Sequence, residues 1–122
     1  LAAGAFITPT LVDSVDPQSR IAQEEVFGPV VVTMPFADED EAVALANGTD
    51  YGLVTALWTQ NISRAHRVAA EVEAGQIFVN TYGAGGGVEL PFGGFKKSGY
   101  GREKSIEALD EYTQTKTVAI KL

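Results

Sequence analysis

Few residues of this chain carry side chains suited to covalent or acid–base chemistry. The sequence has one histidine, His66, and no cysteine, so it offers no disulfide, no thiolate metal ligand and no cysteine nucleophile. His66 lies in a stretch with apolar residues at helical spacing, where it could be a general base or a partly exposed helix residue. Composition favours the second interpretation, and one histidine among scattered acids predicts no metal site.

Four adjacent acidic residues, at positions 38–41, form a second candidate site. They could bind a cation, but the pattern also suits the start of a helix. Asp38 is a favourable N-cap, and Glu41 three residues later completes a capping box. Acidic side chains are also stabilised at the positive end of a helix dipole. We interpret the cluster as the solvated first turn of a helix over residues 39–46.

Three irregular segments combine glycine or proline with chemically useful groups. Residues 83–87 (GAGGG) could present backbone N–H groups to an anion or form a plain surface loop, and glycine content alone favours the loop. Residues 91–95 (PFGGF) either pack under another segment or shape a pocket. Residues 23–29 place two carboxylates and an aromatic ring just before a predicted strand. Spacing alone assigns no reaction to any of the three.

The elements that would position these segments alternate along the chain. β-branched and apolar runs predict strands at residues 30–36, 54–59 and 77–80, with helices over 39–46 and 61–75 between them. Short links in the order βαβαβ are typical of parallel strands joined by right-handed crossovers, which predicts an α/β fold. Ligands bind beyond the carboxyl ends of such strands.

Capping residues and apolar spacing set the expected limits of the two helices. The first helix should bury Val43 and Ala46 and end at Gly48. The second should be capped by Asn61 or Ser63 and end at Gly75.

The two ends of the chain are predicted to be less regular. Residues 5–12 read as an edge strand or extended arm because Pro9 cannot donate to a ladder. Residues 102–112 predict a helix. Residues 115–122 alternate with period two and predict a half-buried strand, whose apolar face would consist of Val118, Ile120 and Leu122.

The composition excludes several classes of protein. The chain has 122 residues and a formal net charge of −7, which suits about one domain and argues against non-specific binding to nucleic acid or an anionic membrane. No apolar run approaches the ~18 residues that span a bilayer. Because no signal peptide is visible, we expect a cytoplasmic location. Because the sequence starts with leucine, we expect a processed product or a piece of a longer protein.

Five segments, in order, resemble motifs of the aldehyde dehydrogenase superfamily. Residues 24–30, 47–53, 75–80 and 91–103 read EEVFGPV, NGTDYGL, GQIFVN and PFGGFKKSGYGRE, and residues 112–118 read YTQTKTV. Members of that family are several times longer, and their nucleotide-binding domain, catalytic cysteine and general-base glutamate lie upstream of these motifs. The resemblance therefore implies the C-terminal part of such an enzyme.

The resemblance also implies a division of the chain and an activity. Residues 1–101 would be the last part of the catalytic domain, and residues 102–122 a helix and an oligomerisation strand. In the family a cysteine thiolate attacks an aldehyde, NAD(P)⁺ accepts a hydride, and water releases the acid. The complete protein would then be a homodimer or homotetramer that uses NAD or NADP and a small aldehyde. This chain, which lacks the cysteine, would be inactive alone.

The resemblance assigns roles to individual residues. Glu25 would accept hydrogen bonds from the two nicotinamide ribose hydroxyls, which suits a carboxylate with two acceptor oxygens. Phe27 would pack near the nicotinamide ring. Phe92 would line the substrate tunnel, and Tyr82 would begin the loop at its mouth. Glu103 matches a glutamate sometimes assigned to proton relay.

The aldehyde itself is not implied, because residues 83–87 lack the aromatic ring that the family often carries there. A different class of protein, a non-catalytic assembly or binding module with the same fold, is the alternative. The sequence upstream of this chain would discriminate the two, since only the enzyme needs a cysteine-bearing catalytic segment and a nucleotide-binding unit.

Overall fold

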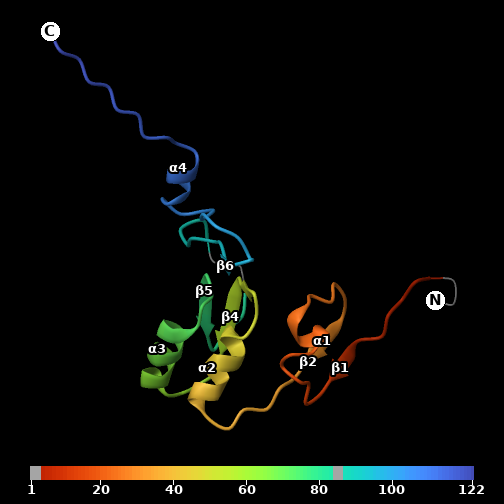
Figure 1. The fold of residues 1–122 in the computed structure, drawn as a ribbon. Coiled ribbons are helices and arrows are strands. Elements are labelled where there is room, and N and C mark those ends of the chain that lie inside the picture. Colours follow the sequence, from red (N-terminus) through yellow and green to blue (C-terminus); the bar gives the residue numbers. More distant parts are fainter. Residues whose placement is uncertain (1–3, 84–86) are drawn as a thin grey trace. The chain divides into compact units, whose positions relative to one another are not determined.

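The computed structural model describes residues 4–83 and 87–122. Two compact units, Leu1–Thr49 and Asp50–Leu122, make up the chain (Figure 1). The elements in chain order are β1 (Thr10–Val12), α1 (Arg20–Gln23), β2 (Val30–Val32), α2 (Glu39–Asn47), β3 (Tyr51–Gly52), β4 (Val54–Leu57), α3 (Ile62–Glu71), β5 (Gln76–Val79), β6 (Phe95–Lys96) and α4 (Ala108–Glu111).

The first unit contains a parallel pair of strands. β1 and β2 pair in a register that places Thr10 opposite Val30. The strand expected over residues 5–12 is shortened to β1, which begins directly after Pro9, because proline has no N–H to donate. The strand expected over residues 30–36 is shortened to β2.

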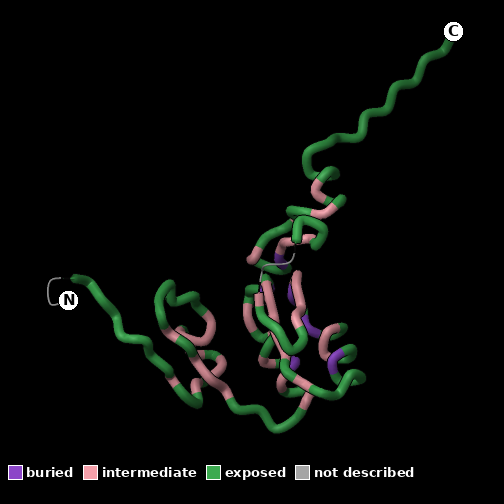
Figure 2. Tube along the Cα trace, turned by 180° about the vertical axis from the view of Figure 1, so that it is seen from behind, coloured by how far each residue is buried: buried purple, intermediate pink, exposed green. Residues whose placement is uncertain are grey.

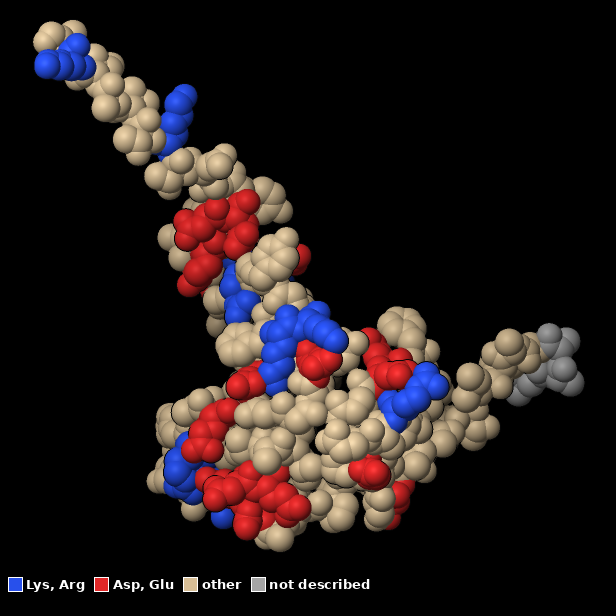
Figure 3. Space-filling view, in the orientation of Figure 1, with Lys and Arg blue, Asp and Glu red and all other residues tan. Residues whose placement is uncertain are grey.

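Helix α2 begins where the acidic cluster predicts. The Asp38 side chain accepts a hydrogen bond of 2.9 Å from the Glu41 N–H, and the Glu41 carboxylate accepts one of 2.6 Å from the Ala37 N–H. The return bond of the capping box therefore lies one residue earlier than the simple pattern. Acidic side chains gather on the surface at this end of α2 (Figure 3). Val43 is buried and Gly48 is the C-cap, as expected. Ala46 is exposed, so the expectation that it is buried is wrong.

The second unit contains a βαβ motif made of β4, α3 and β5. β4 and β5 are parallel, with Val54 opposite Gln76, so the crossover expected for this half of the chain is confirmed. Asn61, rather than Ser63, caps α3 by accepting a hydrogen bond of 3.0 Å from the Arg64 N–H. The helix ends at Glu71, so the expectation that Gly75 ends it is wrong.

The buried residues of this unit gather on α3 and the segment that follows it (Figure 2). The buried apolar residues are Ala65, Val72 and Ala74. Val72 is extended and leads the chain from α3 into β5. The core therefore sits between the helix and the parallel pair.

The described residues do not form the single βαβαβ sheet that the sequence predicts. They form three two-stranded sheets, β1–β2, β4–β5 and the antiparallel pair β3–β6. β2 pairs with β1, and the expected parallel βαβ order holds only for β4, α3 and β5. The reason is that β3 and β6 are two-residue strands with no apolar run, which local patterns do not detect, and that local patterns do not specify that β2 pairs with β1.

The end of the chain is less helical than the sequence predicts. Instead of a helix over residues 102–112, only α4 forms. Lys104 and Ser105 have φ values of 62° and 50°, which a right-handed helix cannot contain. Residues 113–122 run as an extended segment (Figure 1), exposed and outside any strand ladder among the described residues. The strand expected over 115–122 therefore stays a prediction.

Candidate functional site

The two residues expected to contact coenzyme lie in the first unit, between α1 and β2. The Gly28 N–H donates to the Val26 carbonyl at 2.7 Å, and the Val30 N–H donates to the Gly28 carbonyl at 2.8 Å. These two tight bonds make the chain turn sharply and place Phe27 at the apex. Its side chain is 98% exposed. The ring is thus presented outward by a turn that glycine and proline shape.

The adjacent carboxylates Glu24 and Glu25 have different surroundings. Arg20, one helical turn earlier, holds Glu24 in a two-pronged pair, with Nε and Nη2 each 2.8 Å from a carboxylate oxygen. The hydrogen bond from Arg20 lowers the pKa of Glu24. Glu25 is exposed and has no hydrogen bond or ion pair with any of residues 4–83 and 87–122. Of the two, Glu25 alone keeps both oxygens available to a ligand.

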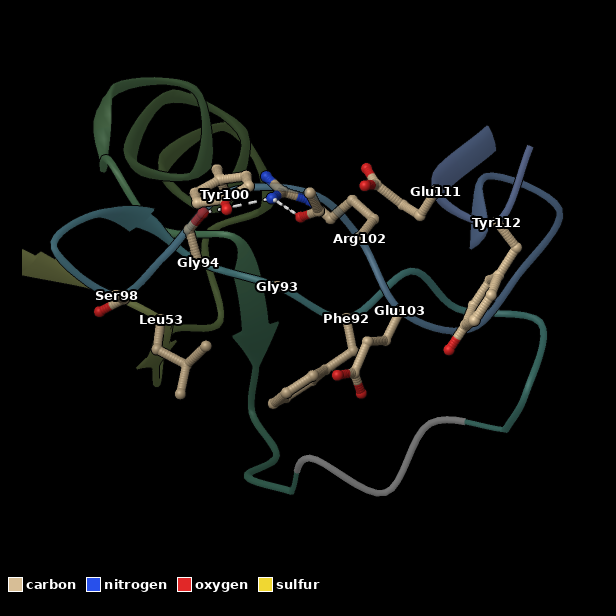
Figure 4. A pocket seen from close by; sticks show the side chains of 11 residues that line it. Leu53, Phe92, Gly93, Gly94, Ser98, Tyr100, Arg102, Glu103, Glu111 and Tyr112 are labelled. Carbon is tan, nitrogen blue, oxygen red and sulfur yellow. Dashed lines mark hydrogen bonds between the residues drawn. The ribbon is translucent and has the colours of Figure 1, made fainter. Parts of the chain in front are cut away.

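The second unit contains a pocket of about 410 Å³ (Figure 4). Phe92 and Glu103 lie next to each other in its wall, and Tyr100 and Arg102 lie further along it. The complete lining consists of Leu53, Phe92, Gly93, Gly94, Ser98, Tyr100, Gly101, Arg102, Glu103, Glu111 and Tyr112. The structure therefore brings together two of the three residues that the resemblance assigns to substrate or proton transfer.

A backbone bridge joins two walls of this pocket. Phe92 and Glu103 form an isolated antiparallel bridge, in which each N–H donates to the other carbonyl at 2.7 Å. Arg102 adds two side-chain bonds, from Nη1 to the carbonyls of Gly94 at 3.2 Å and Gly101 at 2.7 Å. Its guanidinium carbon also lies 5.5 Å from the centre of the Phe95 ring, close enough for a cation–π contact.

Glycine is required where the pocket wall meets β5. A Cβ atom on Gly75 would lie 1.6 Å from the Gly93 carbonyl oxygen, a distance that no side chain permits. The other special position is Gly101, whose φ of +77° is a conformation that side chains rarely adopt. Gly75 thus allows two backbone segments to approach closely, and Gly101 allows the left-handed turn of the backbone in the pocket lining.

Ion pairs hold the antiparallel pair β3–β6 next to the pocket. Lys97 Nζ lies 2.5 Å from the Asp50 carboxylate, and Lys96 Nζ lies 2.7 Å from the Glu73 carboxylate. The hydrogen bond between Lys97 and Asp50 lowers the pKa of Asp50 and raises the pKa of Lys97. The Ser98 hydroxyl accepts a bond of 3.0 Å from the Gly52 N–H. Together with the β3–β6 ladder these contacts hold the loop over residues 91–103 against β3.

Tyr82 lies outside the pocket. It follows β5 with its side chain 74% exposed and does not contribute to the pocket lining. The loop that it begins includes residues 84–86, which are outside the described residues, as is most of the 83–87 segment considered as an anion site. The structure therefore does not bring Tyr82 together with Phe92.

The remaining candidates are His66 and the acidic residues considered as metal ligands. His66 is exposed on α3, as the second interpretation predicts. Within residues 4–83 and 87–122, no group of three or more His, Cys, Asp or Glu side chains could hold a metal ion. No helix in the same residues is long and apolar enough to cross a membrane.

Sequence reasoning did not single out Arg102 or Gln76 as individual residues. Arg102 was expected to begin a helix, whereas it bridges the walls of the pocket. Gln76 opens β5, and its side chain donates to the Pro91 carbonyl. The available signals were the flanking glycines, because Gly75 permits a close backbone approach and Gly101 a positive φ.

Fold and site together describe a mixed α/β protein with an outward-facing carboxylate and aromatic pair in one unit and a glycine-walled pocket in the other. Over residues 1–118 the chain matches the Aldehyde dehydrogenase family. The chain therefore belongs to the aldehyde dehydrogenase family.

Relatives and solved structures agree with this assignment. The NADP/NAD-dependent aldehyde dehydrogenase PuuC of Escherichia coli is 48% identical over 118 residues, covering 97% of this chain and 24% of PuuC. The indole-3-acetaldehyde dehydrogenase AldA of P. syringae, solved with NAD⁺, is 50% identical with a TM-score of 0.88, covering 96% of this chain and 23% of AldA. The same identity, TM-score and coverages hold for the aldehyde dehydrogenase KauB of Pseudomonas aeruginosa. The chain spans about a quarter of the length of the curated relatives it matches.

Proposed function

We propose that the complete protein is an NAD(P)⁺-dependent aldehyde dehydrogenase that oxidises a small aldehyde to a carboxylic acid. In this proposal the present chain supplies part of the coenzyme site and part of the substrate pocket. The cysteine nucleophile belongs to the rest of the protein. Family membership supports this assignment, as do the coenzymes of PuuC, which is NADP/NAD-dependent, and of AldA, which was solved with NAD⁺.

The contrast between Glu24 and Glu25 is the observation that carries the coenzyme assignment. A vicinal diol presents two O–H donors, and a carboxylate with both oxygens available can accept both. Glu25 meets this requirement, whereas Arg20 occupies both oxygens of Glu24. The exposed ring of Phe27, two residues later, offers an apolar surface for a planar ring. When bound, NAD(P)⁺ would supply the hydride acceptor.

The pocket in the second unit fits the proposed substrate role of Phe92. The ring projects from a backbone that is hydrogen-bonded on both sides to Glu103, so its position is well determined. A rigid aromatic wall discriminates aldehydes by shape. Tyr82, exposed after β5, is proposed to act from the mouth of the pocket rather than from its wall. Glu103 is proposed to relay a proton from the same wall.

The exposed tail is proposed to join subunits. Residues 115–122 alternate apolar and polar side chains, and the apolar ones are exposed, with Val118 at 69% and Ile120 at 80%. An unpaired strand with an apolar face gains both backbone hydrogen bonds and burial by pairing with another chain. We therefore propose a homo-oligomer, dimeric or tetrameric, for the complete enzyme.

The function can be tested directly by expressing the complete protein and, separately, the isolated chain. The complete protein, expressed from its full reading frame, should reduce NAD⁺ or NADP⁺ in the presence of aldehydes, and the carboxylic acid should appear in equal amount. The isolated chain should reduce neither coenzyme. If the pure complete protein bound no coenzyme and oxidised no aldehyde in a broad panel, the non-catalytic assembly module would be the better description.

A further inference from the structure

The side chain of Gln76 reaches from β5 to the chain segment that carries Phe92. Its Nε2 donates a hydrogen bond of 3.0 Å to the carbonyl oxygen of Pro91. Gln76 is the first residue of β5, where the parallel ladder with β4 fixes its backbone. The contact therefore runs from a rigid element to a loop.

The peptide unit between Pro91 and Phe92 is held at both of its polar ends. Its carbonyl accepts from Gln76, and its N–H, which belongs to Phe92, donates to the Glu103 carbonyl at 2.7 Å. A peptide unit is planar, so two bonds at opposite edges fix its rotation about the chain direction. That rotation helps to set the direction in which the Phe92 side chain leaves the backbone.

The neighbouring residues support the same docking. A Cβ atom on Gly75 would lie 1.6 Å from the Gly93 carbonyl oxygen, so the backbones of 75 and 93 are in direct contact. Residues 75–76 thus meet residues 91–93 at two consecutive points, one a backbone contact and the other a side-chain hydrogen bond. Only the hydrogen bond from the Gln76 side chain can be removed by a substitution that does not force the two backbones apart.

The Gln76 side chain contributes to this contact through its Nε2 donor and not through its Oε1 atom. Oε1 is buried and has no hydrogen-bond partner among residues 4–83 and 87–122. Burying an amide oxygen without a partner costs free energy. A side chain of similar length without polar atoms would avoid this cost, but it would also lose the donor to Pro91.

We propose that Gln76 is a positioning residue that orients Phe92 and thereby tunes which aldehydes the complete enzyme prefers. This inference rests on the proposed function, because Phe92 must contact substrate for its orientation to affect preference. Gln76 itself does not line the pocket and touches neither substrate nor coenzyme in this proposal.

The first test is a double-mutant cycle in the complete enzyme. Gln76→Met keeps the length of the side chain and removes the donor; Gln76→Glu keeps the size and replaces the donor with an acceptor. Each should change the ratio of kcat/KM between bulky and small aldehydes by about two- to ten-fold, the ratio that corresponds to one net hydrogen bond. In a Phe92→Ala background neither should change that ratio further, because residues that act through one another are not additive. Coenzyme KM should stay unchanged.

The second test does not depend on activity. Hydrogen–deuterium exchange of the complete enzyme, followed by mass spectrometry of peptides that cover residues 91–103, should show faster exchange at the Phe92 amide in both Gln76 variants. Gln60, an exposed glutamine next to α3, provides the matched control. Gln60→Met should leave both the exchange at Phe92 and the substrate ratio unchanged.

The outcomes separate this inference from the proposed function. If Phe92→Ala changes the substrate ratio while both Gln76 variants leave the ratio and the exchange unchanged, the positioning role is overturned. If Phe92→Ala leaves the ratio unchanged, the substrate role of Phe92 is overturned. The proposed effect of Gln76 on the preference among aldehydes is then overturned as well. Faster exchange at Phe92 in that case would still support the orienting contact.

Discussion

Phe92 and Glu103, eleven positions apart, are joined by two reciprocal backbone hydrogen bonds of 2.7 Å. Their side chains lie in the wall of the same pocket (Figure 4). The two residues that follow Glu103, Lys104 and Ser105, have φ values of 62° and 50°, which a right-handed helix cannot contain. The bridge therefore shapes the pocket wall, and the left-handed backbone directly after it accounts for the late start of α4 at Ala108.

Glu25→Gln in the complete enzyme should slow hydride transfer by about ten-fold or more. The substitution keeps the shape of the side chain and removes a charge-assisted hydrogen bond, which contributes about 1.5–3 kcal/mol, so the reacting ring would be placed less accurately. Single-turnover kinetics and coenzyme affinity are the measurements. Glu24→Gln is the matched control and should change neither quantity, because Arg20 already occupies that carboxylate. Equal behaviour of the two variants would contradict the assignment.

Phe92→Ala in the complete enzyme should reorder the preferred aldehydes, with relative kcat/KM values shifting by about ten-fold, while coenzyme affinity stays constant. The physical reason is that the ring forms a wall of the pocket. Phe95→Ala is the comparison, since that ring packs against Arg102 and does not line the pocket; it should lower stability without reordering substrates. An unchanged order accompanied by a large loss of stability in Phe92→Ala would instead identify a core phenylalanine.

Deletion of residues 115–122 from the complete enzyme should give monomers or aggregates. Without this segment the proposed pairing between subunits loses its strand, and the surface of the other subunit that the strand would cover becomes exposed. Sedimentation velocity measures the result. A truncated protein that keeps both its native oligomeric mass and its solubility would show that the tail is not an assembly element.

Asn80 and Thr59 extend the β4–β5 pairing beyond its last ladder residues. Asn80 Oδ1 accepts from the Thr59 N–H and Asn80 Nδ2 donates to the Thr59 carbonyl, both at 2.8 Å. Its φ is +56°, a conformation that asparagine tolerates.

Asn80→Ala should therefore lower the unfolding free energy of the complete enzyme by about 1–3 kcal/mol for the two lost bonds, with added strain from the left-handed backbone. Asn80→Gly should lose the bonds without the strain and be the milder change. Denaturant unfolding gives both values. Thr59→Ser is the control, since Asn80 uses only the backbone of residue 59, and the variant should retain both bonds as well as the hydroxyl that accepts from the Asn61 N–H. Equal losses in the alanine and glycine variants would exclude the strain contribution.

The pair of Asp50 and Lys97 predicts a pH dependence. Lys97 lowers the pKa of Asp50, so the stabilisation from this carboxylate is complete above its ordinary value of 3.8 and is lost as pH falls below it. Asp50 raises the pKa of Lys97, so the contribution of the lysine is complete below 10.5 and is lost as pH rises through the raised value. Between these limits the contribution should be constant.

Asp50→Asn should consequently destabilise the complete enzyme slightly at neutral pH, because the pair is solvent-exposed, and the difference from the unchanged enzyme should shrink below pH 3.8. Urea unfolding across the acid range measures this difference. Asp110→Asn, at an exposed aspartate outside any ion pair among the described residues, should show no such pH-dependent difference. A difference for Asp50→Asn that persisted unchanged into the acid range would contradict the ion-pair explanation.

The features that the sequence determined by itself are local or carried by motifs. The starts of α2 and α3 follow from Asp38 and Asn61, whose side chains bond to an N–H only three residues away. The crossover from β4 to β5 follows from two apolar runs on either side of an amphipathic helix. Membership of the aldehyde dehydrogenase family follows from motifs in order along the chain, and the match over residues 1–118 confirms it.

Tertiary structure alone decided the contacts between distant residues. The β3–β6 pairing joins Tyr51 to Lys96, and an isolated backbone bridge joins Phe92 to Glu103. No local rule predicts either contact, because a short strand takes its partner from whatever the rest of the chain places beside it. At the coenzyme site the reason is different: the motif names both Glu24 and Glu25, and the short helix α1, which the sequence patterns did not predict, brings Arg20 onto Glu24 four residues later and leaves Glu25 available.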